Sequence, residues 1–182
     1  MKRWFAVVAL LLLAPAVARA QEQAAQSDEE AEPIAASLRS TYEPIKRYLT
    51  MAADQAPDEL YAFRPTPDVR TFGQLIGHII NAHYNFCAAA LGERRPVQEN
   101  FEQRVEKAAL VEALAASFEY CDRAYGTLTD AKAAEETSVF GRPRPRIYPL
   151  IYNVAHDNEH YGNIVTYMRM NGLVPPSSQP RS

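Results

Sequence analysis

Apolar residues recur every three or four positions in four stretches of the chain, and this spacing predicts four α-helices. The first helix is expected from about residue 34 to residue 53. Pro44 lies inside this span and predicts a kink or a division of the helix. The apolar positions that define it are Ile34, Leu38, Tyr42, Ile45, Leu49 and Ala52.

The other three helices have clearer ends. The second is expected over 71–91, because Thr71 and Gln74 form a capping box and Gly92 follows the last apolar position. The third is expected over about 107–128. The fourth is expected over about 148–171, where Gly172 suits the helix end and Pro175 and Pro176 prevent continuation.

The connections are rich in proline or in polar residues, and no segment shows the alternating β-branched pattern of a strand. They cover 56–70, 92–105 and the stretch before the fourth helix, where FGRPRPR (140–146) is interpreted as irregular. Helices of about 20 residues with connections of this length predict an all-α four-helix bundle. The bundle is expected over 34–174, with a C-terminal tail over 175–182.

The N-terminus has the pattern of a signal peptide at 1–20. Lys2 and Arg3 precede an apolar run from Trp4 to Ala14, and Ala18-Arg19-Ala20 gives the small-x-small cleavage pattern. The run is shorter than the roughly 20 residues that a membrane span needs. We therefore expect cleavage, export to the periplasm or the medium, and no membrane attachment afterwards. Residues 21–33 are polar and acidic and are expected to form a disordered leader.

Size and charge limit the partners of the mature chain. Removing 20 of the 182 residues leaves 162, enough for one domain with a substantial core. The formal net charge of −3 becomes −6 once Lys2, Arg3 and Arg19 are removed. An acidic domain argues against nucleic acid and anionic lipid as partners.

Two of the four histidines lie four residues apart in HDNEHYGNIV, residues 156–165. His156 and His160 point away from the apolar sector of the fourth helix. The stripe they share contains no lysine, arginine or acid; its other members are Asn153, Asn163, Tyr167 and Asn171. A polar but uncharged stripe is more typical of a lined cleft than of an open solvent face.

The second helix repeats this pattern, because it has no charged residue between 71 and 91. His78 lies on a polar stripe with Gln74, Asn81 and Asn85. His83 instead points into the apolar sector and is interpreted as a core histidine with a backbone partner. If the two polar stripes face each other, three imidazoles converge.

Three converging imidazoles can bind one metal ion, since residues four apart lie about 6 Å apart along a helix. Nitrogen ligands with a free coordination position suit zinc, nickel, copper or ferrous iron better than magnesium or calcium. Asp157 and Glu159 flank the pair on either side, so neither is expected as a direct ligand.

Weaker interpretations stay open at this point. An HxxxH pair is common in helices by chance, so the histidines could be purely structural. Arg142, Arg144 and Arg146 of the FGRPRPR loop could anchor an anionic substrate, although a solvated surface loop is the preferred interpretation.

The segments FGQLIGHIINAHYNFC and YNVAHDNEHYGNIVTYMRMNG resemble the two signature helices of the DinB/YfiT-like superfamily. The resemblance covers about 34–174 and is specific at these two helices. It implies an up-down-down-up four-helix bundle and a divalent metal on His78, His156 and His160. It also implies an activity, because characterised members are transferases and isomerases that use low-molecular-weight thiols, and many others are thought to be metal-dependent hydrolases. Those thiols are cytoplasmic, which does not suit an exported chain.

The topology that this resemblance implies makes the second and third helices parallel. Cys87 and Cys121 would then lie at similar heights, and a disulfide would be sterically allowed. Export permits such a bond. Buried free cysteines are the slightly preferred expectation.

The leading hypothesis is therefore an exported metalloprotein with Zn²⁺ or Ni²⁺ on His78, His156 and His160. It would act as a metal-dependent hydrolase or a thiol-dependent transferase on a small molecule. Substrate-facing groups are expected at Asn81, Asn153 and Tyr167. The alternatives are a non-catalytic bundle that binds a metal or small ligand, and a bundle that serves only as an interaction partner. Such bundles often pair through helix faces, so a homodimer stays open.

Overall fold

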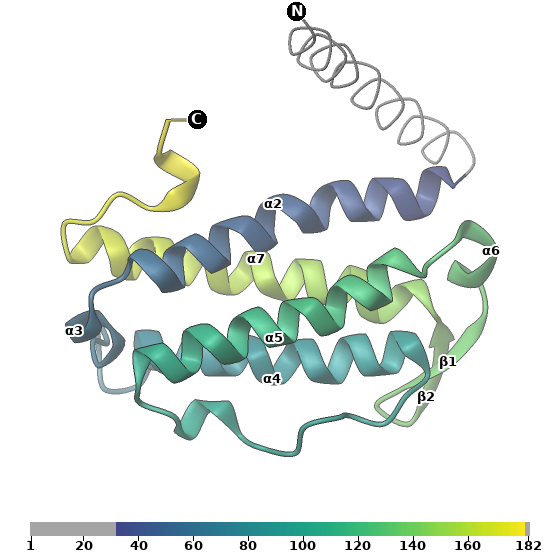
Figure 1. Ribbon diagram of the computed structural model, residues 1–182, viewed down its shortest axis with the longest axis horizontal. Helices are drawn as coiled ribbons and strands as arrows, with labels where there is room; N and C mark the ends of the chain where they lie inside the picture. The colour runs from purple at the N-terminus through teal and green to yellow at the C-terminus, as the bar shows by residue number, and fades with distance from the viewer. Residues whose placement is uncertain (1–31, 181–182) are drawn as a thin grey trace, which may run out of the picture.

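Four long helices form an up-down-down-up bundle in the computed structural model, which describes residues 32–180. Figure 1 shows α2 and α7 running in one direction and α4 and α5 in the other. The expected signal peptide and all but the last two residues of the expected leader lie outside the described residues. The four helices are α2 (Pro33–Gln55), α4 (Phe72–Leu91), α5 (Lys107–Gly126) and α7 (Ile147–Met170).

Helix α2 is continuous through Pro44, so the expected division of this helix is wrong. The proline removes one backbone hydrogen bond at the half-exposed side of the helix, a cost of about 3 kcal/mol. The opposite face buries seven residues, and each large apolar side chain contributes about 1.5–3 kcal/mol. They are Ala35, Leu38, Tyr42, Ile45, Leu49, Ala52 and Ala53.

Helix α4 begins and ends where its sequence predicts. The Thr71 side chain accepts from the backbone N–H of Gln74, and the Gln74 side chain accepts from the backbone N–H of Thr71. Gly92 ends the helix with φ 72°. The helix packs against both α5 and α7, which explains why it carries no charged residue.

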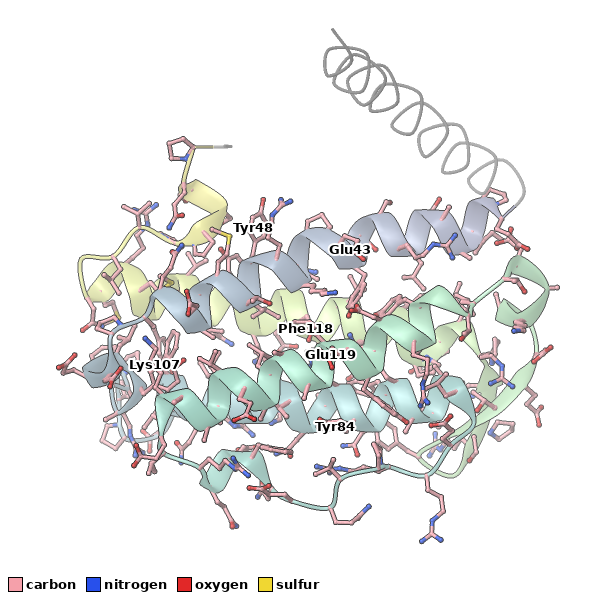
Figure 2. All side chains as sticks on the ribbon, in the orientation of Figure 1. Glu43, Tyr48, Tyr84, Lys107, Phe118 and Glu119 are labelled. Atoms are coloured by element: carbon pink, nitrogen blue, oxygen red, sulfur yellow. A yellow bond between two sulfur atoms is a disulfide. The ribbon has the colours of Figure 1, made fainter. Side chains whose placement is uncertain are left out.

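Helix α5 has a buried face and a solvent face, and adjacent residues can lie on opposite faces. Phe118 points into the bundle, where its ring lies 4.5 Å from the His83 ring, whereas the adjacent Glu119 is exposed (Figure 2). Two short helices lie in the connections: α3 (Asp58–Tyr61) follows α2 along the chain, and α6 (Asp130–Ala133) follows α5.

The connection from α4 to α5 runs back along the bundle and packs on α4 (Figure 1). It contains a 3₁₀ turn, η1 (Phe101–Gln103). The closest approach is at Gly77, where a Cβ atom would lie 2.3 Å from the carbonyl oxygen of Phe101. Only glycine fits this position, and it lets η1 lie directly beside the helix.

A β-hairpin occupies the region that was expected to be irregular. Strands β1 (Glu136–Val139) and β2 (Arg142–Pro145) pair antiparallel, with Glu136 opposite Pro145. Phe140 and Gly141 form the turn, both with positive φ. Strand β2 consists of alternating arginines and prolines, so its sequence does not show the pattern typical of a strand. A contact with α4 holds the hairpin in place. Thr137 Oγ1 donates to the carbonyl of Ala89 at 2.6 Å.

Cys87 and Cys121 form a disulfide between α4 and α5, with their Cα atoms 5.2 Å apart. The preference for free cysteines is therefore wrong. Both residues are fully buried. The two helices that the disulfide joins run parallel to each other (Figure 1).

The C-terminal segment returns to the bundle after α7. It forms the 3₁₀ turn η2 (Pro176–Ser178), and the backbone N–H of Ser177 donates to the Tyr161 hydroxyl at 2.9 Å. Among the helices of residues 32–180, none is both long enough and apolar enough to cross a membrane.

Candidate metal centre

The three histidines expected to converge do so between α4 and α7. Nε2 of His156 lies 3.2 Å from Nε2 of His78 and 3.1 Å from Nε2 of His160. One ligand atom from each residue lies within 4.8 Å of the other two. Zinc holds imidazole nitrogens at about 2.0–2.1 Å, which separates two such nitrogens by roughly 3 Å. The spacing of the cluster therefore fits a single small cation.

Protonation of His156 and His160 is disfavoured. Burial, with the neighbouring His160 and His78, lowers the pKa of His156 to about 3. Burial and then His78 also lower the pKa of His160. His156 and His160 are therefore neutral near pH 7, and their lone pairs are available to a cation. Such lone pairs repel one another at 3.1–3.2 Å unless a proton or a metal ion lies between them.

Glu102 orients His78 and was missed by the sequence analysis. Its Oε1 lies 2.7 Å from Nδ1 of His78, and its Oε2 accepts from Nε of Arg70 at 2.9 Å. Burial alone would raise the pKa of Glu102, but the hydrogen bonds from Arg70 and His78 outweigh it and lower that pKa. A carboxylate at Nδ1 fixes the proton there and leaves Nε2 as the metal-binding atom.

The buried His83 connects three helices. Nδ1 lies 2.8 Å from Ser117 Oγ on α5, and Nε2 lies 3.0 Å from Asp157 Oδ1 on α7. His83 and Asp157 are both 0% exposed. The expectation of a core histidine is confirmed, but its partners are side chains rather than the backbone. Asp157 points into the core and does not approach the three-histidine cluster as a ligand.

The three residues expected to face a substrate lie in different places. Tyr167 lines a cleft beside His160, and its hydroxyl donates to the carbonyl of Arg70 at 2.8 Å. Asn81 is half-buried and holds the α4–α5 connection, because its Oδ1 accepts from the backbone N–H of Phe101.

Asn153 does not lie in this cleft, which corrects its expected placement. It is 0% exposed, and its amide donates to Asp157 Oδ2 at 3.1 Å and to the Tyr125 hydroxyl at 3.2 Å. The polar stripe of α7 is therefore divided. Asn153 belongs to the core network around Asp157, whereas His160, Asn163 and Tyr167 face the cleft.

The cleft has a volume of about 590 Å³ and opens beside His160. Its wall combines charged, polar and apolar side chains from the segment before α4, from the first turn of α4, from η1 and from α7. They are Asp68, Val69, Arg70, Gln74, Leu75, Glu102, Glu159, His160, Asn163 and Tyr167. The arginines of the hairpin are not among them. The cleft is large enough for a small molecule that contacts His160, the one histidine of the cluster among its lining residues.

Fold and site together define a four-helix bundle with a three-histidine candidate metal centre, and comparison with known proteins agrees. A family model described as the DinB superfamily matches residues 41–164, a segment that contains all three histidines. The chain belongs to this superfamily. No curated protein matches the chain significantly.

Two solved structures share the fold. A DinB-like protein from Bacillus cereus ATCC 10987 has a TM-score of 0.67 at 19% identity, covering 76% of this chain and 93% of that one. A DinB-like protein from Bacillus subtilis has a TM-score of 0.63 at 20% identity, covering 80% of this chain and 99% of that one. At these identities the likeness concerns the fold.

Proposed function

We propose that this chain is an exported metalloprotein that binds one divalent cation, zinc or nickel, through Nε2 of His78, His156 and His160. The observation that carries the proposal is the convergence of three imidazole nitrogens within 4.8 Å. Nitrogen donors of this kind suit borderline cations and not magnesium or calcium. With three protein ligands, a coordination position stays free on the side of the cleft.

The activity that fits best is metal-dependent hydrolysis of a small molecule. A metal ion with three protein ligands and a free position lowers the pKa of water or of a thiol, and so supplies a nucleophile near neutral pH. Glu102 holds the His78 ring, and Glu159, which lines the cleft beside His160, can accept a proton from the nucleophile.

Thiol transfer is the second candidate, and the disulfide makes it the weaker one. The bond between Cys87 and Cys121 suits an oxidising compartment, as expected for an exported chain. The low-molecular-weight thiols that resembling transferases use are cytoplasmic. Water is therefore the more accessible nucleophile.

Elemental analysis of the protein purified from its native compartment tests the metal site. We expect roughly one equivalent of zinc or nickel, and loss of that metal in a His156→Ala/His160→Ala variant. Asn158→Ala is the matched control, because Asn158 lies on the same helix but is exposed. The proposal is wrong if the double variant and the control retain equal metal, or if neither takes up added zinc or nickel.

A Glu159→Gln variant separates hydrolysis from simple binding. Loss of a general base typically lowers turnover by about 100-fold or more. We expect that loss on a panel of small esters and amides, with the metal content unchanged. A metal-loaded protein that hydrolyses none of them would favour a non-catalytic binding bundle.

Mass spectrometry of the exported protein tests localisation, with Gln21 as the expected first residue.

A further inference from the structure

The cleft beside the three-histidine cluster contains one guanidinium, that of Arg70, among its lining residues. Two contacts fix this residue. Its Nε donates to Glu102 at 2.9 Å, and its backbone carbonyl accepts from the Tyr167 hydroxyl at 2.8 Å. Within residues 32–180, neither Nη nitrogen of Arg70 has a hydrogen-bond partner in the protein. A positioned pair of N–H donors is therefore available to a ligand.

A guanidinium held through Nε presents its Nη donors in a plane, and this fork matches a carboxylate with two parallel hydrogen bonds. Lysine cannot reproduce this geometry, because its ammonium is a flexible point charge. The cleft is also lined by Gln74 and Asn163, whose uncharged amide groups can donate further hydrogen bonds to such a carboxylate.

Arg70 is close enough to the histidines for both to act on one small molecule. Two hydrogen bonds in series connect them, from Arg70 Nε to Glu102 and from Glu102 to Nδ1 of His78. One small molecule can therefore bind Arg70 with one group and place a second, reacting group at the histidines.

We propose that the substrate carries a carboxylate that binds Arg70 while its reacting group lies at the three-histidine cluster. The inference rests on the proposed metal site and narrows its substrate to small carboxylic acids. Asp68 and Glu159 also line the cleft, but both are exposed to solvent, which screens their repulsion. Glu102 is already paired with Arg70.

Three hydroxamates that share the metal-chelating group and differ in their tails test this assignment on the zinc-loaded protein. Acetohydroxamate chelates the metal and has no charged tail, succinate monohydroxamate adds a carboxylate, and β-alanine hydroxamate adds an ammonium. Affinities are measured by calorimetry. We expect succinate monohydroxamate to bind about 10-fold more tightly than acetohydroxamate. We expect β-alanine hydroxamate to show no such gain.

The ratio of the two affinities is compared within each variant, so that a change in zinc binding cancels. In Arg70→Ala the ratio should fall to about 1, and in Arg70→Lys it should be intermediate. Arg64→Ala is the matched control, because Arg64 is a nearby arginine that does not line this cleft. Its ratio should remain that of the unmodified protein.

The possible failures are distinguishable. If the protein takes up no zinc, the proposed function fails and the carboxylate site fails with it. If acetohydroxamate binds but the added carboxylate gives no gain, or the gain survives Arg70→Ala, only the carboxylate site is overturned. Tighter binding of β-alanine hydroxamate than of succinate monohydroxamate would also overturn it, and would assign the cleft to a cationic group at Asp68 and Glu159.

Discussion

At the scale of single residues, Glu102 connects the fold to the candidate metal centre. In Glu102→Gln the acceptor at Nδ1 of His78 becomes a neutral amide, so the imidazole is a weaker ligand. Loss of such an outer carboxylate typically lowers metal affinity by about 10–100-fold. We expect this change in a chelator competition titration. Glu99→Gln is the control, since Glu99 lies in the same connection and pairs with Arg104 instead. Equal affinities in both variants would contradict the role of Glu102.

The buried pair of His83 and Asp157 acts on stability rather than on the cation. In Asp157→Ala, both His83 Nε2 and the Asn153 amide lose a buried partner. Breaking a buried pair of this kind costs about 3–5 kcal/mol. Urea unfolding of the metal-free protein should show this loss, whereas Asn158→Ala should change stability by about 0.5 kcal/mol or less. A loss of less than about 1 kcal/mol in Asp157→Ala would show that the network is replaceable.

At the scale of the elements, the long helices are predictable from the sequence and the hairpin is not. Apolar spacing and the Thr71–Gln74 capping box are local signals, and they place α4 within one residue. The hairpin depends on contacts with distant residues, such as that of Thr137 with Ala89, and its turn uses Phe140 where asparagine would signal it.

The candidate site likewise contains residues that the sequence predicts and residues that it does not. His78, His156 and His160 are found because each lies on a regular helix, where sequence position determines the face. Glu102 lies in a connection without periodicity, so its approach to His78 depends on packing around Gly77. Asn153 was misplaced because helical position alone does not separate a cleft from a buried polar network.

Gly77 makes that packing testable. In Gly77→Ala the new methyl group would lie 2.3 Å from the Phe101 carbonyl oxygen, so η1 must move away from α4. Overpacking of this kind costs about 1–3 kcal/mol. Since η1 contains Glu102, we also expect a metal affinity lower by roughly 10-fold.

Gly162→Ala is the matched control for this change. Gly162 lies in α7, and a Cβ there meets nothing within 4 Å. Alanine should stabilise that helix by about 0.5–1 kcal/mol. Thermal unfolding and the same chelator titration compare the two variants. A neutral effect of Gly77→Ala on both measurements would mean that η1 does not position Glu102.

At the scale of the whole molecule, the disulfide restrains the two parallel central helices. It closes a loop with a sequence separation of 34 residues. Restricting the unfolded chain in this way contributes about 3–4 kcal/mol. We expect a Cys87→Ala/Cys121→Ala variant to lose that much stability in urea unfolding. We also expect reductant to destabilise the unmodified protein but not the variant. Insensitivity of both to reductant would show that the cysteines are not bonded in solution.

The lowered pKa values of His156 and His160 make the stability of the metal-free bundle depend on pH. The pKa of His156 is about 3 in the folded protein against an ordinary value of 6.5, so the unfolded chain binds more protons between these limits. The free energy of unfolding must then decrease as pH falls from about 6.5 towards 3. The pKa of Glu102 is lowered from 4.5, and its contribution is lost only below about that pH.

Unfolding measurements between pH 6.5 and 5 therefore isolate the histidine effect. In His156→Gln we expect a smaller decrease over this range, with the remainder due to His160, whose pKa is also lowered. Bound zinc should shift the whole transition to lower pH, since the cation competes with protons for the same nitrogens. The same pH dependence in His156→Gln and in the unmodified protein would contradict the assignment of that low pKa to His156.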